Sequence, residues 1–375
     1  MLFTNAFSIN AILSPLTLMS SSILIYYYYS ILRIKFNKKS FLFLFLSITS
    51  LISTITITIS TANYHEYYSQ IILYLSPFIL FYLAPLFLFT IKKPNLIQLS
   101  KSAFFPLLII SIFVIIEFLL KNIFNITIIL PRGGVSEFEA MVSILNIYRP
   151  RGFMEEPGHL ALFISIFLPL SLFYANTLSK KNKVISISIF LSSWLLTFSI
   201  ASFISATISL LITLLIERKI KFKLNAKSFF LFFIILGITL TFSIPIIEVI
   251  LNKLNSSSFN DRVEKTFYSL DLIKNGNFFD FIFGLGPGYY IKYDIPSPIN
   301  LYLNIITGYG ISGLTFLLIF ITSLTFKAIK LSPLILFALM TSLLHYLFIS
   351  NIWYPWFWWL ASIITYSYKY RKDIL

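Results

Sequence analysis

The stretch RPRGFMEEPGH, which ends at His159, places two arginines and two glutamates within eight positions. Arg149 and Arg151 carry planar charged forks that can bind a phosphate or a carboxylate through paired hydrogen bonds. Glu155 and Glu156 are acids beside them, and a carboxylate so placed can take a proton from a reacting hydroxyl group. This combination predicts a site where a phosphorylated substrate binds and a proton is moved.

A structural interpretation of the same charges stays open. Pro157 suits the first turn of a helix, because its missing N–H would be unpaired there. Glu155 and Glu156 would then lie beside the positive end of the helix dipole, and the arginines would neutralise them. Exposed ion pairs contribute only ~0–1 kcal/mol, however, so stability alone gives little reason to place the whole set here.

The elements that must position these residues are apolar helices. Hydrophobic residues make up 58% and charged residues 11% of the 375 positions, a composition that no soluble domain could bury. We therefore expect an all-α polytopic membrane protein that forms a single transmembrane domain over residues 1–375. The first 32 residues carry no charge, so they lack the basic start of a signal peptide and are expected to be a retained span. The lack of cysteine excludes disulfides, thiolate metal sites and cysteine nucleophiles.

Apolar runs of membrane length, separated by basic or Pro/Asn/Gly-containing breaks, predict about eleven transmembrane helices. Their expected ranges are 9–32, 41–61, 70–91, 103–120, 158–178, 184–198, 201–216, 228–247, 299–326, 332–350 and 355–368. Residues 184–216 could also form one long helix, but the alternation of basic connections requires two helices with a turn near residues 199–202.

Lysine and arginine cluster in alternate connections, which sets the orientation by the positive-inside rule. Six short stretches hold 20 of the 29 basic residues, namely 33–39, 92–101, 180–183, 217–227, 327–330 and 369–372. We expect these to be cytoplasmic, so the long loops 121–157 and 248–298 lie on the opposite side of the membrane. Membrane orientation thus explains the net charge of +15, and no nucleic acid is expected as a partner. Arginine is 3 of 20 basic residues inside but 4 of 9 outside, which favours phosphate binding on the outer face.

The second outer loop predicts an amphipathic helix on the membrane surface. Ser258 and Asp261 have the spacing of a capping box, and Asn275 and Gly276 end the run. Between them, apolar residues follow at helical intervals at Val263, Phe267 and Leu270. Arg262 falls in the expected first turn, where a cation is unfavourable for the helix dipole, so it is expected to meet a ligand or an acid.

Three other features carry weaker signals. The stretch GLGPGYY at 284–290 predicts a tight turn whose backbone N–H groups, around Gly286, could bind an anion. His159 and His345 lie near outer helix ends, where each is either a buried hydrogen-bonded residue or part of the site. Glu117 is an intramembrane acid and hence a candidate by default. No spacing of His, Asp and Glu predicts a metal site.

The aromatic run WYPWFWW at residues 353–359 has a structural interpretation. It lies at a helix end, and tryptophan and tyrosine at such positions are typical of an interfacial belt between the bilayer and water.

Several of these motifs resemble one family. The stretch RGFMEEP at 151–157 is similar to the Arg-Gly…Glu-Pro stretch of Wzy-type O-antigen and exopolysaccharide polymerases. Arg262, the GLGPG turn and the stretch NLYLNIITGYGISGL at 300–314 resemble that family's second periplasmic loop and the helix behind it. The resemblance covers residues 145–320. It departs at Ile299, where relatives often have a histidine, and this departure argues against the O-antigen ligases that share the fold.

The resemblance implies a GT-C-like glycosyltransferase in the bacterial inner membrane, which joins undecaprenyl-pyrophosphate-linked repeat units on the periplasmic side without cofactor or metal. It implies that Arg149, Arg151 and Arg262 hold the pyrophosphate and that Glu156 or Glu155 is the base, with Glu156 preferred because it matches the Glu-Pro motif. Asn300, Gly286 and His159 would contact the pyrophosphate or the glycan. Further partners would be the bilayer, a chain-length regulator and a flippase.

Two alternatives stay open. One is an O-antigen ligase that transfers the finished glycan to lipid A core. The other is a flippase or transporter for the lipid-linked unit, although transporters generally need polar or broken helices near the membrane midplane, whereas the polar residues here lie in outer loops.

Overall fold

The computed structural model describes residues 77–128, 141–142, 147–217, 257–286, 289–292, 299–352 and 354–371. The predicted spans 9–32, 41–61 and 228–247 lie outside these ranges, as does the start of the predicted span 70–91.

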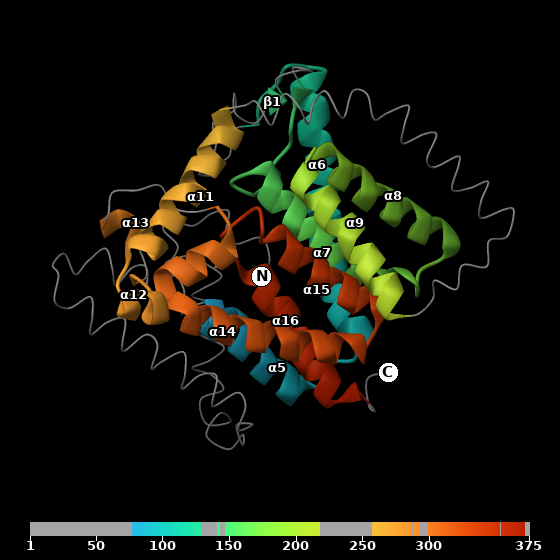
Figure 1. Cartoon of the computed structure of the whole chain (residues 1–375). Coiled ribbons are helices and arrows are strands. Elements are labelled where there is room, and N and C mark those ends of the chain that lie inside the picture. Colours follow the sequence, from blue (N-terminus) through green and yellow to red (C-terminus); the bar gives the residue numbers. More distant parts are fainter. Residues whose placement is uncertain are drawn as a thin grey trace, which may run out of the picture.

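Most of the described chain is helical (Figure 1). In chain order the elements are the π-helix η2 (Phe78–Leu83), α5 (Ala84–Lys92), α6 (Leu96–Asn122), β1 (Met141–Val142), β2 (Ile147–Tyr148), α7 (Pro157–Ala175), α8 (Lys180–Leu196), α9 (Ile200–Ile216), α11 (Ser257–Asn275), α12 (Phe278–Phe283), α13 (Tyr289–Lys292), α14 (Leu301–Ile329), α15 (Pro333–His345) and α16 (Pro355–Lys369). The two short strands pair antiparallel. Every predicted span within the described ranges contains a helix.

Three of the helices, α6, α7 and α14, are long and apolar enough to cross a bilayer. At 1.5 Å per residue, their 27, 19 and 29 residues measure about 40, 28 and 43 Å, against about 30 Å of hydrocarbon. Shorter apolar helical segments cover Phe78–Lys92, Ile200–Ile216 and Pro333–His345. These features fit an all-α membrane protein.

Helix α7 is central and packs against α6, α8, α9, α15 and α16 (Figure 1). Its side chains from Leu160 to Ile164 are fully buried, and so are Ile166 and Phe167. A helix that is apolar on all sides belongs in the interior of a bundle. The amino end of α7, where the charged stretch lies, is therefore held by a packed core.

The start of α6 was predicted wrongly. The helix begins at Leu96 instead of residue 103, because Asn95 and Gln98 form a capping box in which each side chain accepts a hydrogen bond from the other's backbone N–H. Lys101, which we expected in a connection, consequently lies within the helix.

The two-helix prediction for residues 184–216 is confirmed. α8 ends at Leu196 and α9 begins at Ile200, with Phe198 between them at a φ of 46°. A positive φ is rare for a bulky residue, so it marks a sharp break and not a continuous helix.

The interfacial belt predicted for the aromatic run is wrong for four of its described aromatic residues, while Trp359 is only partly buried. Tyr354, Trp356, Phe357 and Trp358 are all 6% exposed or less. They are enclosed because α16 packs against η2, α5, α14 and α7, and the indole N–H of Trp358 donates to the carbonyl of Ile352 at 2.6 Å. These four side chains belong to the hydrophobic core.

The amphipathic helix of the second loop is present as α11, but it begins earlier than predicted. Ser258 lies inside the helix instead of capping it, so Arg262 falls in the second turn. Phe267 is 61% exposed and Leu270 46% exposed. Their positions, four and seven residues after Val263, put them on one face of the helix.

Helix α14 is broken where the second loop packs against it. Gly310 has φ 66° and ψ −170°, which is not helical, and a Cβ there would lie 2.2 Å from the carbonyl oxygen of Ile282 in α12. On the other side of this contact, the N–H groups of Leu285 and Gly286 donate to the carbonyls of Thr307 and Gly308, each at 2.9 Å. Backbone hydrogen bonds thus join the GLGPG turn of the second loop to helix α14.

Candidate functional site

The end of α6 fastens the charged stretch to the bundle. Glu117 is 2% exposed and its two carboxyl oxygens accept separate hydrogen bonds, from the Tyr148 hydroxyl at 2.9 Å and from the Gly152 N–H at 2.8 Å. Asn122 pairs with the backbone of Tyr148 through both its amide atoms, at 2.7 and 3.0 Å. The intramembrane acid suggested by the sequence therefore positions the loop.

A tight turn follows Arg151. Gly152 has a φ of 57°, and a Cβ there would come within 3.2 Å of the Val114 side chain on α6. Glycine suits this position because it adopts the left-handed conformation at no steric cost. The next side chain, Phe153, stacks on Phe113 of α6 with ring centroids 4.5 Å apart. In this stretch, Gly152 and Phe153 therefore shape the turn, while Arg151 supplies the charge.

Arg149 is directed to the break between α8 and α9. Its Nε donates to the carbonyl of Thr197 at 3.0 Å, and Thr197 is the C-cap residue of α8. A cation is favourable at the carboxyl end of a helix, where carbonyls lack helical partners. This contact gives Arg149 a structural role in addition to the predicted one.

The amino end of α7 agrees with the prediction from Pro157. The proline occupies the first turn and Glu156 is the N-cap residue, although its carboxylate makes no capping hydrogen bond. Glu155 precedes it with a side chain that is 50% exposed. Both acids therefore lie at the positive end of the helix dipole.

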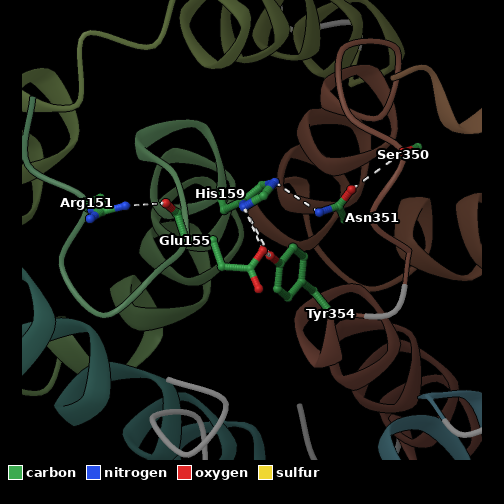
Figure 2. A network of polar contacts seen from close by, with 6 residues as sticks. All are labelled: Arg151, Glu155, His159, Ser350, Asn351 and Tyr354. Atoms are coloured by element: carbon green, nitrogen blue, oxygen red, sulfur yellow. Dashed lines mark hydrogen bonds and ion pairs between the residues drawn. The ribbon is translucent and has the colours of Figure 1, made fainter. Parts of the chain in front are cut away.

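A chain of polar contacts begins at this point (Figure 2). Arg151, only 8% exposed, donates from Nη1 to the backbone carbonyl of Glu155 at 3.0 Å. The Oε2 of Glu155 accepts from the Tyr354 hydroxyl at 2.6 Å, and that hydroxyl also lies 3.0 Å from Nδ1 of His159. On the far side of the imidazole, Nδ2 of Asn351 lies 3.2 Å from Nε2. The cluster joins the start of α7 to the segment between α15 and α16.

Tyr354 is a permanent hydrogen-bond donor in this cluster. Burial first, and then the neighbouring Glu155 carboxylate, raise the pKa of Tyr354 well above its usual value. Its hydroxyl keeps its proton over the physiological range, and it cannot serve as a base there.

Two of the remaining candidates, Asn300 and Gly286, are engaged in hydrogen bonds of their own. Asn300 caps α14, with its side chain accepting from the N–H of Leu303 at 3.1 Å. The amide of Gly286 already donates to Gly308, so it is engaged in packing. Arg262 lies on α11, and its side chain is outside the described set. His345 is fully buried at the end of α15. Within the described residues, no group of three or more His, Cys, Asp or Glu could hold a metal ion.

Sequence reasoning missed Tyr354 and Asn351. Both are separated from His159 by more than 190 positions, and Tyr354 was assigned to the aromatic belt. Tyr354 also lies in a run rich in tryptophan, and the sequence alone does not show whether its side chain donates a hydrogen bond or only packs in the core.

Comparison with protein-family models, with curated proteins and with solved structures finds no match to this chain.

Proposed function

We propose that this chain is a glycan polymerase of the bacterial inner membrane, which transfers a growing glycan from undecaprenyl pyrophosphate to the next lipid-linked repeat unit. In this proposal the chain has about eleven spans in a GT-C-like arrangement, and its site faces the periplasm. The basis is the resemblance of three motifs to Wzy-type polymerases, together with the chemistry of the cluster at the start of α7.

One observation carries the proposal. The half-exposed side chain of Glu155 lies just before the amino end of a core helix, and Arg151 donates a hydrogen bond to the backbone carbonyl of the same residue. Fixed cations and helix amino ends stabilise a pyrophosphate that gains charge as it leaves. A carboxylate beside them can accept the proton of the attacking hydroxyl.

A hydroxyl of the acceptor unit attacks the anomeric carbon of the donor glycan, and a new glycosidic C–O bond forms. The bond between that carbon and the phosphate oxygen breaks, and its electron pair leaves with the lipid pyrophosphate. The hydroxyl proton passes to Glu155 or Glu156, while Arg149, Arg151 and Arg262 bind the leaving group.

Reconstitution tests the proposal. The purified chain in lipid nanodiscs should convert lipid-pyrophosphate-linked single repeat units, extracted from a strain lacking its gene, into longer lipid-linked glycans with release of undecaprenyl pyrophosphate. Arg151→Ala and Arg262→Lys should abolish this conversion at normal protein levels, because lysine cannot reproduce the bidentate fork. Transfer of glycan to added lipid A core without chain growth would identify a ligase instead. Translocation of the lipid-linked unit without any transfer would identify a transporter.

A further inference from the structure

The geometry points to Glu155 as the group that takes the proton from the acceptor hydroxyl, and to Tyr354 as the positioning residue that holds it. This inference rests on the proposed function and names the acting carboxylate within it. It differs from the preference for Glu156 that the Glu-Pro motif suggested.

The two carboxylates have different surroundings. Oε2 of Glu155 accepts from the Tyr354 hydroxyl at 2.6 Å, and the Glu155 side chain is 50% exposed. Glu156 is the N-cap residue, and within the described part of the chain its carboxylate makes no capping hydrogen bond that would hold it. A base acts efficiently only when it is held within reach of the proton it removes. Glu155 therefore combines an oxygen held by Tyr354 with a side chain that is half exposed (Figure 2).

The hydrogen bonds that link Glu155 to Tyr354, His159 and Asn351 can be assigned with one consistent set of donors and acceptors. Tyr354 has a single hydroxyl proton, and the short contact assigns it to Glu155. The same oxygen must then accept from Nδ1–H of His159 at 3.0 Å. A neutral imidazole with its proton on Nδ1 has an acceptor at Nε2, which Nδ2 of Asn351 faces at 3.2 Å. His159 thus supports Tyr354 with one ring nitrogen and is held by Asn351 through the other.

The Tyr354 ring is held independently of its hydroxyl. It stacks on Trp356 with centroids 4.5 Å apart and packs on the His159 ring at 4.8 Å. Phenylalanine at this position would keep both contacts. The substitution Tyr354→Phe therefore removes the hydrogen bond to Glu155 with little change in packing.

The experiment measures kcat and KM for polymer formation in nanodiscs, with lipid-linked single repeat units as substrate. We expect Glu155→Gln to lower kcat by about 100-fold or more, and Glu156→Gln to change it by less than about tenfold. We expect Tyr354→Phe to lower kcat by about 10- to 100-fold with KM unchanged, and to lower the melting temperature because Nδ1–H of the buried His159 loses its acceptor. The matched control is Tyr346→Phe, which removes the hydroxyl of another buried tyrosine that has no hydrogen-bond partner among the described residues. It should leave kcat unchanged.

A second readout does not depend on activity. Nitrogen NMR of the three histidines, assigned by substitution of His65 and His345, should show the Nδ1–H tautomer for His159 at neutral pH, and Tyr354→Phe should perturb that signal. An unchanged kcat in Tyr354→Phe, a larger loss in Glu156→Gln than in Glu155→Gln, or an Nε2–H tautomer would overturn the inference. If the wild-type chain makes no polymer, the proposed function is wrong. The NMR result then decides the direction of the hydrogen bonds by itself.

Discussion

The carboxyl group of Glu117 offers a quantitative test of how the candidate site is held. Glu117→Ala would leave two buried donors without their acceptor, the Tyr148 hydroxyl and the Gly152 N–H, now at 2.9 and 2.8 Å. Each stranded donor costs about 1–3 kcal/mol, so the substitution should destabilise the protein by about 2–6 kcal/mol. Glu117→Gln keeps one acceptor oxygen, and its NH2 can donate to the Tyr148 oxygen once that hydroxyl rotates. The expected cost is therefore only about 1–2 kcal/mol.

The assay is thermal unfolding of both variants in nanodiscs, followed by tryptophan fluorescence, with polymer formation measured in parallel. We expect a large drop in the unfolding midpoint for Glu117→Ala and a small one for Glu117→Gln, which should stay active. A Glu117→Ala variant as stable as the wild type would refute the positioning role. Loss of activity in Glu117→Gln at unchanged stability would instead show that the carboxylate takes part in the chemistry.

Two further predictions concern the second loop and the helix glycines. Gly310→Ala should prevent folding or strongly lower the unfolding midpoint, because its Cβ would lie 2.2 Å from the backbone of α12. The control Gly158→Ala should be neutral, since a Cβ there would have nothing within 4 Å. Equal effects of the two substitutions would contradict the packing of α12 on α14. The chain has no cysteine, so single cysteines can be labelled with an environment-sensitive fluorophore. A label at position 279, where Phe279 is 66% exposed, should be quenched by nitroxide lipids, whereas a label at the exposed position of Asp271 should not. Equal quenching of the two labels would argue against α11 and α12 lying on the membrane surface.

The sequence predicted those parts of the fold that depend on local patterns. Apolar runs located the long helices, and Pro157 gave the start of α7 because a proline without an N–H costs nothing in a first turn. The amphipathic spacing in the second loop likewise predicted α11. Helix starts were missed where side-chain capping outweighed hydropathy, as at Asn95.

Features that depend on contacts between distant segments could not be predicted. The burial of Tyr354 follows from where α16 packs, and its hydrogen bond to Glu155 links positions 199 residues apart. The break at Gly310 is likewise explained only by the approach of α12, since a glycine in an apolar helix is compatible with an unbroken span. In the candidate site, the charged residues could be found from type and spacing, but the hydrogen bonds that distinguish Glu117, Glu155 and Glu156 depend on the tertiary structure.

The most direct test of the proposed polymerase is the lipopolysaccharide gel of a strain that lacks the gene for this chain. We expect lipid A core bearing a single repeat unit, a ladder of longer chains when the wild-type gene is restored, and a single unit again with Arg151→Ala at normal protein levels. Lipid A core without any repeat unit, together with full-length polymer still attached to undecaprenyl pyrophosphate, would contradict the proposal and identify a ligase. Accumulation of repeat units on the cytoplasmic face would contradict it in favour of a flippase.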